Sequence, residues 1–282
     1  MTESMASSAD RGRLAFGVDV GGSGIKAAIV DVDSGEMRSE RLRVPTPVPS
    51  TPDRVSASIA RLVRRLAKAT SIPDDAPVGV GLPGVAIDGR LRTAANIDPA
   101  WVDYPIAEKL SKALKRRVEI VNDADAAGIA EMRFGGGAGK RGTVIFLTLG
   151  TGVGSGVFVD GTLVPNTEFG QMEIRGRPAE RRSASAARTR RGLSWKAWAQ
   201  DLDEHLQRIE ELLWPSLFIL GGGVSKNADK FIPKLTTRTP IVPAQLRNDA
   251  GIVGAGIVAV EGFADAKSTW DDLPEGQRPA PD

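Results

Sequence analysis

The sequence predicts an α/β fold built from two similar halves with a cleft between them. Short apolar runs alternate with longer amphipathic segments, which is typical of α/β proteins. One arrangement also occurs twice, as a strand, a glycine-rich turn and a second strand: first in LAFGVDVGGSGIKAAIV and again in GTVIFLTLGTGVGSGVFV. Each copy opens a stretch of strands and helices, so the pattern indicates a duplicated architecture rather than a short-period repeat.

The composition excludes several classes of chemistry. The 282 residues include no cysteine and a single histidine, His205, which we expect to be structural or on the surface. Disulfides, thiolate chemistry, cysteine-bound zinc and multi-histidine metal sites are therefore excluded, a histidine-based triad is disfavoured, and acid–base chemistry falls to carboxylates or, less often, to Lys and Tyr. The net charge of +2 and the short apolar runs predict neither a specific nucleic-acid partner nor a membrane protein. The polar N-terminus does not resemble a secretory signal, so we expect a cytoplasmic protein.

In the first half, a sheet covered by helices is predicted. An apolar run through 14–20 and another through 25–32 form a hairpin, and an alternating run near 37–44 adds an edge strand. The remaining expected elements are a helix at 54–69, a buried strand at 77–84, a short hairpin at 85–94, a helix at 106–114 and a strand at 117–121.

The second half repeats this theme. Its expected elements are a helix that begins near residue 122, strands at 142–150 and 157–164, a helix at 194–213, a strand at 217–220, a helix after the run GGGVS, a strand at 239–244 and a final helix at 251–262. We expect one lobe of residues 14–121 plus 250–262 and another of residues 122–249. Hinges are predicted near Val121–Asn122 and Asn248–Gly251, while residues 1–13 and the Pro-rich, acidic residues 263–282 are expected to be disordered.

The first glycine-rich turn has the composition of a phosphate-binding loop. Glycine lets the backbone approach a phosphate closely and direct N–H groups at it, and a preceding acid can hold Mg²⁺ through water. The alternatives are a plain hairpin turn and, for the lysine, a surface position. The candidate donor-binding residues are Asp19, Gly21, Gly22, Ser23, Gly24 and Lys26, with Asp19 as the candidate metal ligand.

A second and a third glycine run extend this prediction. The second run follows a strand and adds a hydroxyl to the exposed N–H groups, although a tight turn would also explain it. The third lies between a buried strand and a helix, where a helix N-terminus can meet an anion. The candidate residues are Gly150, Thr151, Gly152, Gly154, Gly221, Gly222 and Gly223.

A candidate general base lies between the two repeated loops, in the run VNDADAAG. Asp123 is placed to accept a proton from a hydroxyl group, and Asn122 to hold a neighbouring hydroxyl. Helix capping is the alternative reading for this Asn-Asp pair. Asp125, inside the first helical turn, is expected to interact with the helix dipole.

A basic segment follows the second loop. Residues 175–196 contain eight Arg and Lys residues and one acid, Glu180. A flexible basic stretch beside the cleft would suit a long polyanion, whereas a solvated surface loop is the alternative.

Taken together in order, these motifs resemble the ROK family of sugar kinases, and within it the polyphosphate glucokinases and glucomannokinases. The matching segments span about residues 14–260 and are GVDVGGSGIKAA, GLPG, AANIDPAW, VNDADAAG, LTLGTGVGS, NTEFG, LGGGVSK and AQLRNDAGIVGAG. The resemblance implies an actin-like ATPase (ribonuclease H-like) fold and a homodimer. It also implies phosphorylation of the 6-hydroxyl of glucose, or of mannose, from polyphosphate or ATP with Mg²⁺.

The resemblance assigns Asp123 as the catalytic base and places sugar contacts on Asn96, Asn122 and Glu168, with Glu180 as a further contact. The zinc-bearing branch of the family carries a cysteine cluster that is absent here, so no zinc is expected. Where the family has histidine after Glu-Phe-Gly, this chain has Gln171, whose amide can donate and accept hydrogen bonds with a different reach.

Two other functions are compatible with parts of the sequence. Gln171 motivates a sugar-binding paralogue with weakened catalysis or altered sugar specificity. The family also includes sugar-responsive repressors, but these carry an N-terminal helix-turn-helix extension, and only polar residues precede the first strand here.

Overall fold

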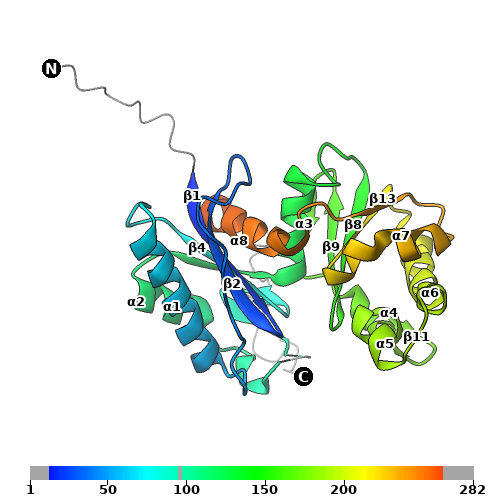
Figure 1. Cartoon of the computed structure of the whole chain (residues 1–282), viewed down its shortest axis with the longest axis horizontal. Coiled ribbons are helices and arrows are strands. Elements are labelled where there is room, and N and C mark those ends of the chain that lie inside the picture. Colours follow the sequence, from blue (N-terminus) through cyan, green and yellow to red (C-terminus); the bar gives the residue numbers. More distant parts are fainter. Residues whose placement is uncertain (1–12, 95–96, 263–282) are drawn as a thin grey trace, which may run out of the picture.

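Two five-stranded sheets form the framework of the protein (Figure 1). The computed structural model describes residues 13–94 and 97–262. The first sheet consists of β1 (Leu14–Gly21), β2 (Gly24–Asp31), β3 (Leu42–Val44), β4 (Val78–Leu82) and β7 (Val118–Asn122). The second consists of β8 (Thr143–Leu149), β9 (Val153–Val159), β10 (Thr162–Val164), β13 (Leu217–Gly221) and β14 (Ile241–Pro243). Two small hairpins are β5 (Ala86–Ile87) with β6 (Arg90–Leu91), and β11 (Glu173–Ile174) with β12 (Arg177–Pro178).

The two sheets have the same topology. Their strand orders are β3-β2-β1-β4-β7 and β10-β9-β8-β13-β14. In each sheet, the first three strands form an antiparallel meander. The first strand of the meander also pairs, on its other edge, with a parallel strand, which in turn pairs with a second parallel strand. The duplicated α/β architecture predicted from the glycine-loop hairpins is therefore confirmed.

Helices cover both faces of each sheet. The helices are α1 (Pro52–Ala69), α2 (Ile106–Leu114), α3 (Asp123–Phe134), α4 (Glu180–Ser183), α5 (Ser185–Arg190), α6 (Trp195–Leu213), α7 (Ala228–Phe231) and α8 (Ala250–Glu261). Because side chains alternate across a strand, Phe16 and Val18 of β1 pack with α1 and α2, whereas Ala15 packs with α8. Likewise, Ile145 of β8 faces α6, and Val144 faces α3.

Helices α3 and α8 consequently lie against each other between the two sheets, as the green and orange helices at the centre of Figure 1. Glycine makes this packing close. A Cβ atom on Gly254 would lie 1.6 Å from the carbonyl oxygen of Ala126, and one on Gly79 would lie 1.8 Å from that of Ala255. Any side chain at these glycines would therefore push α8 away from α3 or from the first sheet.

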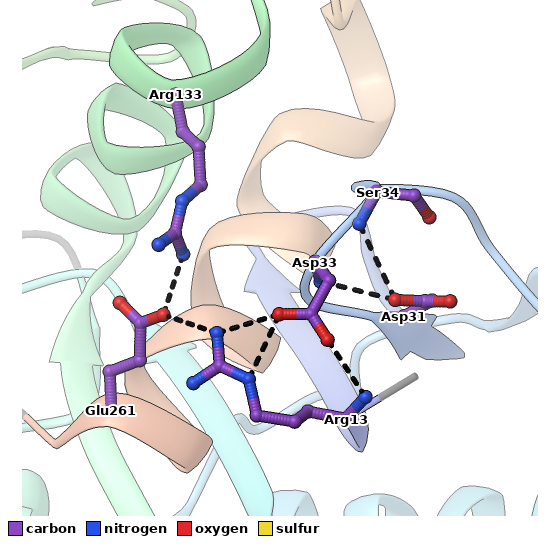
Figure 2. Close-up of polar contacts among 6 residues, drawn as sticks. All are labelled: Arg13, Asp31, Asp33, Ser34, Arg133 and Glu261. Carbon is purple, nitrogen blue, oxygen red and sulfur yellow. Dashed lines mark hydrogen bonds and ion pairs between the residues drawn. The ribbon is translucent and has the colours of Figure 1, made fainter. Parts of the chain in front are cut away.

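An ion-pair network joins these central helices at the ends distant from the catalytic candidate (Figure 2). Glu261 at the end of α8 accepts from Arg13 at 3.0 Å and from Arg133 of α3 at 2.8 Å. Arg13 also donates to Asp33, in the turn after β2, at 2.7 Å. The four side chains are substantially exposed, so each ion pair alone contributes little to the stability of the fold. Together, the pairs link β1, β2, α3 and α8.

Two predicted elements are shorter than expected. The edge strand β3 covers only Leu42–Val44, because the N–H of Ile29 donates to the hydroxyl of Ser39 at 2.9 Å instead of to a backbone carbonyl. After GGGVS, the expected helix is a 3₁₀ segment, Gly223–Asn227, followed by α7, which is only one turn long. Pro233, two residues after the end of α7, cannot donate a helical hydrogen bond.

Candidate active site

Asp123 is the first residue of α3, at the point where β7 ends. Asn122 caps this helix: its Oδ1 accepts from the N–H of Ala124 at 2.8 Å and of Asp125 at 3.0 Å. Its Nδ2 donates to the carbonyl of Gly84 at 3.0 Å. The capping alternative for Asn122 is thus confirmed, and contact with a sugar stays a prediction.

The carboxylate of Asp123 has an unusual environment. Burial, followed by the neighbouring charges of Asp19 and Glu168, raises its pKa to about 7, although the N–H of Ala124 acts in the opposite direction. The residue as a whole is nevertheless only half-buried. A carboxylate whose pKa lies near neutral pH is suited to act as a general base.

Glycines from both sheets leave room around Asp123. A Cβ on Gly81 of β4 would lie 3.5 Å from the Cα of Asp123, and one on Gly154 of β9 would lie 2.7 Å from the Cβ of Ala124. The start of α3 is therefore inserted between the first sheet and the second glycine loop.

The first glycine loop closes the β1–β2 hairpin. Gly21 pairs with Gly24, and Gly22 and Ser23 form an exposed two-residue tip. The hydroxyl of Thr46 donates to the carbonyl of Gly21 at 2.6 Å. These contacts confirm a hairpin and leave the phosphate role of the loop as a prediction.

Lys26 and Asp19 face each other across this hairpin. The ammonium group of Lys26 donates to Oδ2 of Asp19 at 2.8 Å. Asp19 also lies against the start of α8, since a Cβ on Gly251 would be 3.1 Å from its Cγ. A Mg²⁺ ion would need this one carboxylate together with donor phosphates and water, because no group of three potential His, Cys, Asp or Glu ligands occurs within 13–94 and 97–262.

Arg43 is a cation at the first loop that sequence reasoning did not identify. It pairs with Lys26 across β2 and β3, so both side chains share one face of the sheet. Its Nη2 donates to the carbonyl of Ser23 at 2.9 Å, and its guanidinium occupies the space where a Cβ of Gly24 would lie. The strand alternation could have placed Arg43 beside Lys26, had the short pairing of β3 been anticipated.

The second loop is tightly turned and supported by α5. The N–H of Gly150 donates to the carbonyl of Gly152 at 2.9 Å, while the carbonyl of Gly150 accepts from the hydroxyl of Ser185 at 3.0 Å. Thr151 is exposed at the tip. The third run adjoins it, because Gly222, with a φ of 82°, lies against the backbone of Leu149. Gly221 and Gly223 flank this contact, so both runs meet at the ends of the neighbouring strands β8 and β13.

Three predicted sugar-contact residues lie together on the second-sheet side. Glu180 accepts from the N–H of Val153 at 3.0 Å and from Nε2 of Gln171 at 3.2 Å. Burial, and then the charge of Glu180, raise the pKa of Glu168. Since Glu168 in turn raises the pKa of Asp123, these carboxylates converge on one region. Asn96 falls outside the described residues.

A cavity of about 330 Å³ adjoins the first glycine loop. Gly21 and Gly22 form part of its wall, together with residues 46–50, Leu82 and Pro83. Trp101 is buried at its base and donates from its indole to the carbonyl of Ser50 at 2.8 Å. Ile97 and Asp98, which also line it, bring the AANIDPAW motif to this part of the first half.

His205 is buried in α6, as the structural reading predicted. Its Nε2–H donates to the carbonyl of Phe169 at 2.9 Å, and its Nδ1 bonds to the hydroxyl of Ser183 at 2.9 Å. Burial lowers its pKa, so the ring is neutral at physiological pH. The single histidine therefore supports the backbone next to Glu168.

The basic segment is folded, so the expectation of a flexible stretch was wrong. It forms β12, α4 and α5, and acids of α6 hold several of its arginines. Asp201 pairs with Arg182 and Arg191, and Glu204 pairs with Arg175. Sequence reasoning missed this because these acids lie in the following helix, outside the segment that was counted.

Arg188 has a different environment from these paired arginines. Its guanidinium lies over the ring of Trp195, 3.8 Å from the centroid. Its buried Nε has no hydrogen-bond partner among the described residues. Helix α5, which carries Arg188, supports the second loop through Ser185, so this cation lies one helical turn from the loop.

The fold and the site together define an actin-like ATPase-type sugar kinase. The chain belongs to the ROK family, whose sequence model matches residues 15–174. Among its relatives, the polyphosphate glucokinase of Mycobacterium tuberculosis (strain H37Rv) is 46% identical, over 88% of this chain and 92% of that protein. The glucokinase of Streptomyces coelicolor is 28% identical, over 88% of this chain and 98% of that protein.

Solved structures agree with this assignment. The inorganic polyphosphate/ATP-glucomannokinase from Arthrobacter sp. strain KM superposes with a TM-score of 0.86 at 48% identity, covering 89% of this chain and 99% of that one. A ROK family glucokinase from Streptomyces griseus, in complex with glucose and AMPPNP, gives a TM-score of 0.77 at 26% identity, covering 88% and 100%. No helix of the described part is long and apolar enough to cross a membrane.

Proposed function

We propose that this protein is a glucokinase that phosphorylates the 6-hydroxyl of glucose, and of mannose, from polyphosphate or ATP. The observation that carries the proposal is the position of Asp123 at the start of α3, between glycine loops that occupy matching places in the two sheets. The relatives named polyphosphate glucokinase and polyphosphate/ATP-glucomannokinase support both the hexose and the donors.

The proposed reaction is an in-line phosphoryl transfer. Asp123 accepts the proton of the 6-hydroxyl, the new bond forms between that oxygen and the terminal phosphorus, and the bridging P–O bond of the donor breaks. Backbone N–H groups of Gly21–Gly24 and Gly150–Gly154 stabilise charge on the transferred group. Glu168, Gln171 and Glu180 orient the sugar, together with Asn96 and Asn122.

Mg²⁺ is the proposed metal, with Asp19 as its protein ligand through water. A hard cation that retains several waters and binds donor phosphates can be held beside one carboxylate, which is what this site offers. Bound there, it would offset negative charge on the donor. Mg²⁺ would compete with the ammonium group of Lys26 for the carboxylate of Asp19. Calorimetric titration of Mg²⁺ into the enzyme with a non-hydrolysable donor tests this, with the Asp19→Asn variant titrated in parallel. Loss of the Mg²⁺ heat in this variant is the expected result.

The proposal is tested by a coupled assay for hexose 6-phosphate that crosses polyphosphate and ATP with glucose, mannose and an N-acetylated hexosamine. Turnover with glucose is expected with at least one donor. If polyphosphate supports no turnover with any hexose, the assignment of polyphosphate as a donor is wrong and the kinase class remains. If hexose binds by calorimetry but neither donor is consumed, the protein is instead a sugar-binding paralogue, the alternative suggested by Gln171.

We also propose that the protein is cytoplasmic, where its donors, ATP and polyphosphate, are available. We further propose that it forms a homodimer, as the resemblance to the ROK family implies. Light scattering at several protein concentrations measures the mass directly. A mass equal to the 29.8 kDa chain at all concentrations would contradict the dimer.

A further inference from the structure

Asn166 connects the two halves of the protein through its side-chain amide. Its Oδ1 accepts from the N–H of Ala86 at 2.8 Å, and its Nδ2 donates to the carbonyl of the same residue at 3.0 Å. Asn166 follows β10 of the second sheet, whereas Ala86 begins β5, just after β4 of the first sheet. The amide thus pairs with a peptide group of the other half much as a neighbouring strand would.

The backbone of Asn166 is held by a buried carboxyl group. Its N–H donates to Oδ2 of Asp125 at 2.8 Å, and its φ of 60° is a left-handed conformation that asparagine tolerates better than most residues. Asp125 has no solvent exposure, and its Oδ1 has no partner within the described part of the chain. Because Asp125 lies two residues after Asp123, it connects the start of α3 directly to Asn166.

The residues that follow Asn166 are also anchored, on both sides of Glu168. The hydroxyl of Ser155 donates to the carbonyl of Thr167 at 2.6 Å and accepts from the N–H of Phe169 at 3.0 Å. The carbonyl of Phe169 accepts from His205. Glu168 lies between these fixed peptide groups, so its backbone position depends on the contacts of its neighbours.

We propose that Asp125 and Asn166 are positioning residues: Asn166 latches the second half to the first at Ala86, and Asp125 orients Asn166 so that Glu168 faces Asp123. The sugar-orienting part of this inference rests on the proposed function. The latch itself is a property of the fold, and neither residue needs to touch the substrate.

Hydrogen exchange tests the latch without any assay of turnover. In Asn166→Asp, a carboxylate oxygen replaces the donor Nδ2 and faces the carbonyl of Ala86, while the side-chain shape is retained. Faster exchange at the amide of Ala86 is expected in this variant, with unchanged exchange in the core strand β8. In Asp125→Ala, faster exchange is expected at the amide of Asn166. Wild-type exchange at both amides would overturn the latch.

Kinetic measurements test the effect of the latch on the candidate active site. Asn166→Asp and Asp125→Ala are expected to raise the KM for hexose about tenfold, the cost of one or two lost hydrogen bonds, with the donor KM within about twofold. Asp125→Asn keeps an acceptor oxygen for the Asn166 N–H and should recover most of the loss. Asp160→Asn is the matched control, because Asp160 also accepts a backbone N–H, from Gly142 at 2.9 Å, but is exposed.

The outcomes separate the latch from the proposed function. Equal changes in both KM values, or no recovery in Asp125→Asn, would show a merely structural role and overturn the positioning assignment. If Asp125→Ala does not fold, Asn166→Asp carries the same test. If the wild-type protein phosphorylates no hexose, the proposed function fails, while hydrogen exchange still decides whether the latch exists.

Discussion

At the scale of single residues, the site depends on how α3 begins. Asn122 uses its amide to cap the helix, and the carboxylate of the next residue, Asp123, lies within the electrostatic influence of Asp19 and Glu168. The cap is thus built by Asn122, and the adjacent Asp123 stays the predicted base. The Asn-Asp pair in the sequence suggested both roles without separating them.

Replacing Asp123 by Asn should lower kcat by at least about two orders of magnitude, because the amide cannot accept the proton of the sugar hydroxyl. The coupled hexose 6-phosphate assay measures the loss, and Asp160→Asn serves as the control. Turnover near the wild-type level would show that another group is the base.

The raised pKa of Asp123 predicts the pH profile. A base must be deprotonated to work, so kcat/KM should fall as the pH decreases through about 7, and remain constant above it until another group titrates. Glu168→Gln removes a charge that raises this pKa, so the acid limb should move to lower pH in that variant. An acid limb near pH 4 in the wild type would contradict this environment for Asp123.

At the scale of elements, glycine sets the distance between helices and sheets. Gly254 lets α8 approach α3, while Gly17 and Gly79 let it approach the first sheet; a Cβ on Gly17 would lie 2.0 Å from the carbonyl of Ile252. Because α3 carries Asp123 at its N-terminus, this packing also determines where the carboxylate lies.

Gly254→Ala provides a test in which two effects have opposite signs. Intrinsic helix propensity favours Ala over Gly by about 1 kcal/mol, whereas overpacking costs about 1–3 kcal/mol or more. The added Cβ would lie 1.6 Å from a backbone oxygen, so we expect a net loss of stability and a lower Tm by calorimetry. A higher Tm would mean that α3 and α8 can separate without cost.

Helix α5 gives the basic segment a specific place beside the second loop. We propose that Arg188 contacts phosphates of the longer donor, so Arg188→Ala is expected to raise the KM for polyphosphate about tenfold and to leave the KM for ATP within about twofold. Arg208→Ala is a suitable control, since Arg208 is exposed and pairs with Glu211 within α6. Equal effects of the Arg188 variant on both donors would exclude a role in holding the longer chain.

At the scale of the whole molecule, the sequence was sufficient to predict the architecture but not the contacts between its parts. The hairpin of β1 and β2, the helix at Ile106–Leu114 and the duplicated glycine loops follow from local periodicity and turn residues. The pairing of Arg182 with Asp201 and of Asn166 with Ala86 joins residues 19 and 80 positions apart. Such pairs leave no periodic signal in one sequence, so only the structure could identify them.

We propose that the halves move about hinges near Val121–Asn122 and Asn248–Gly251, and that substrates favour the closed state. Small-angle scattering should then show a smaller radius of gyration with glucose plus a non-hydrolysable donor than with either alone. An identical radius in all conditions would argue for a rigid molecule.

The position of α8 in the chain has a consequence for synthesis. The first sheet is complete once β7 has been made, yet the helix that covers one of its faces spans Ala250–Glu261. During translation, the apolar face that includes Ala15, Ala28 and Val30 therefore stays uncovered while more than a hundred further residues emerge from the ribosome. The nascent chain must be protected over that interval, by the ribosome surface or by chaperones, before the first half can mature.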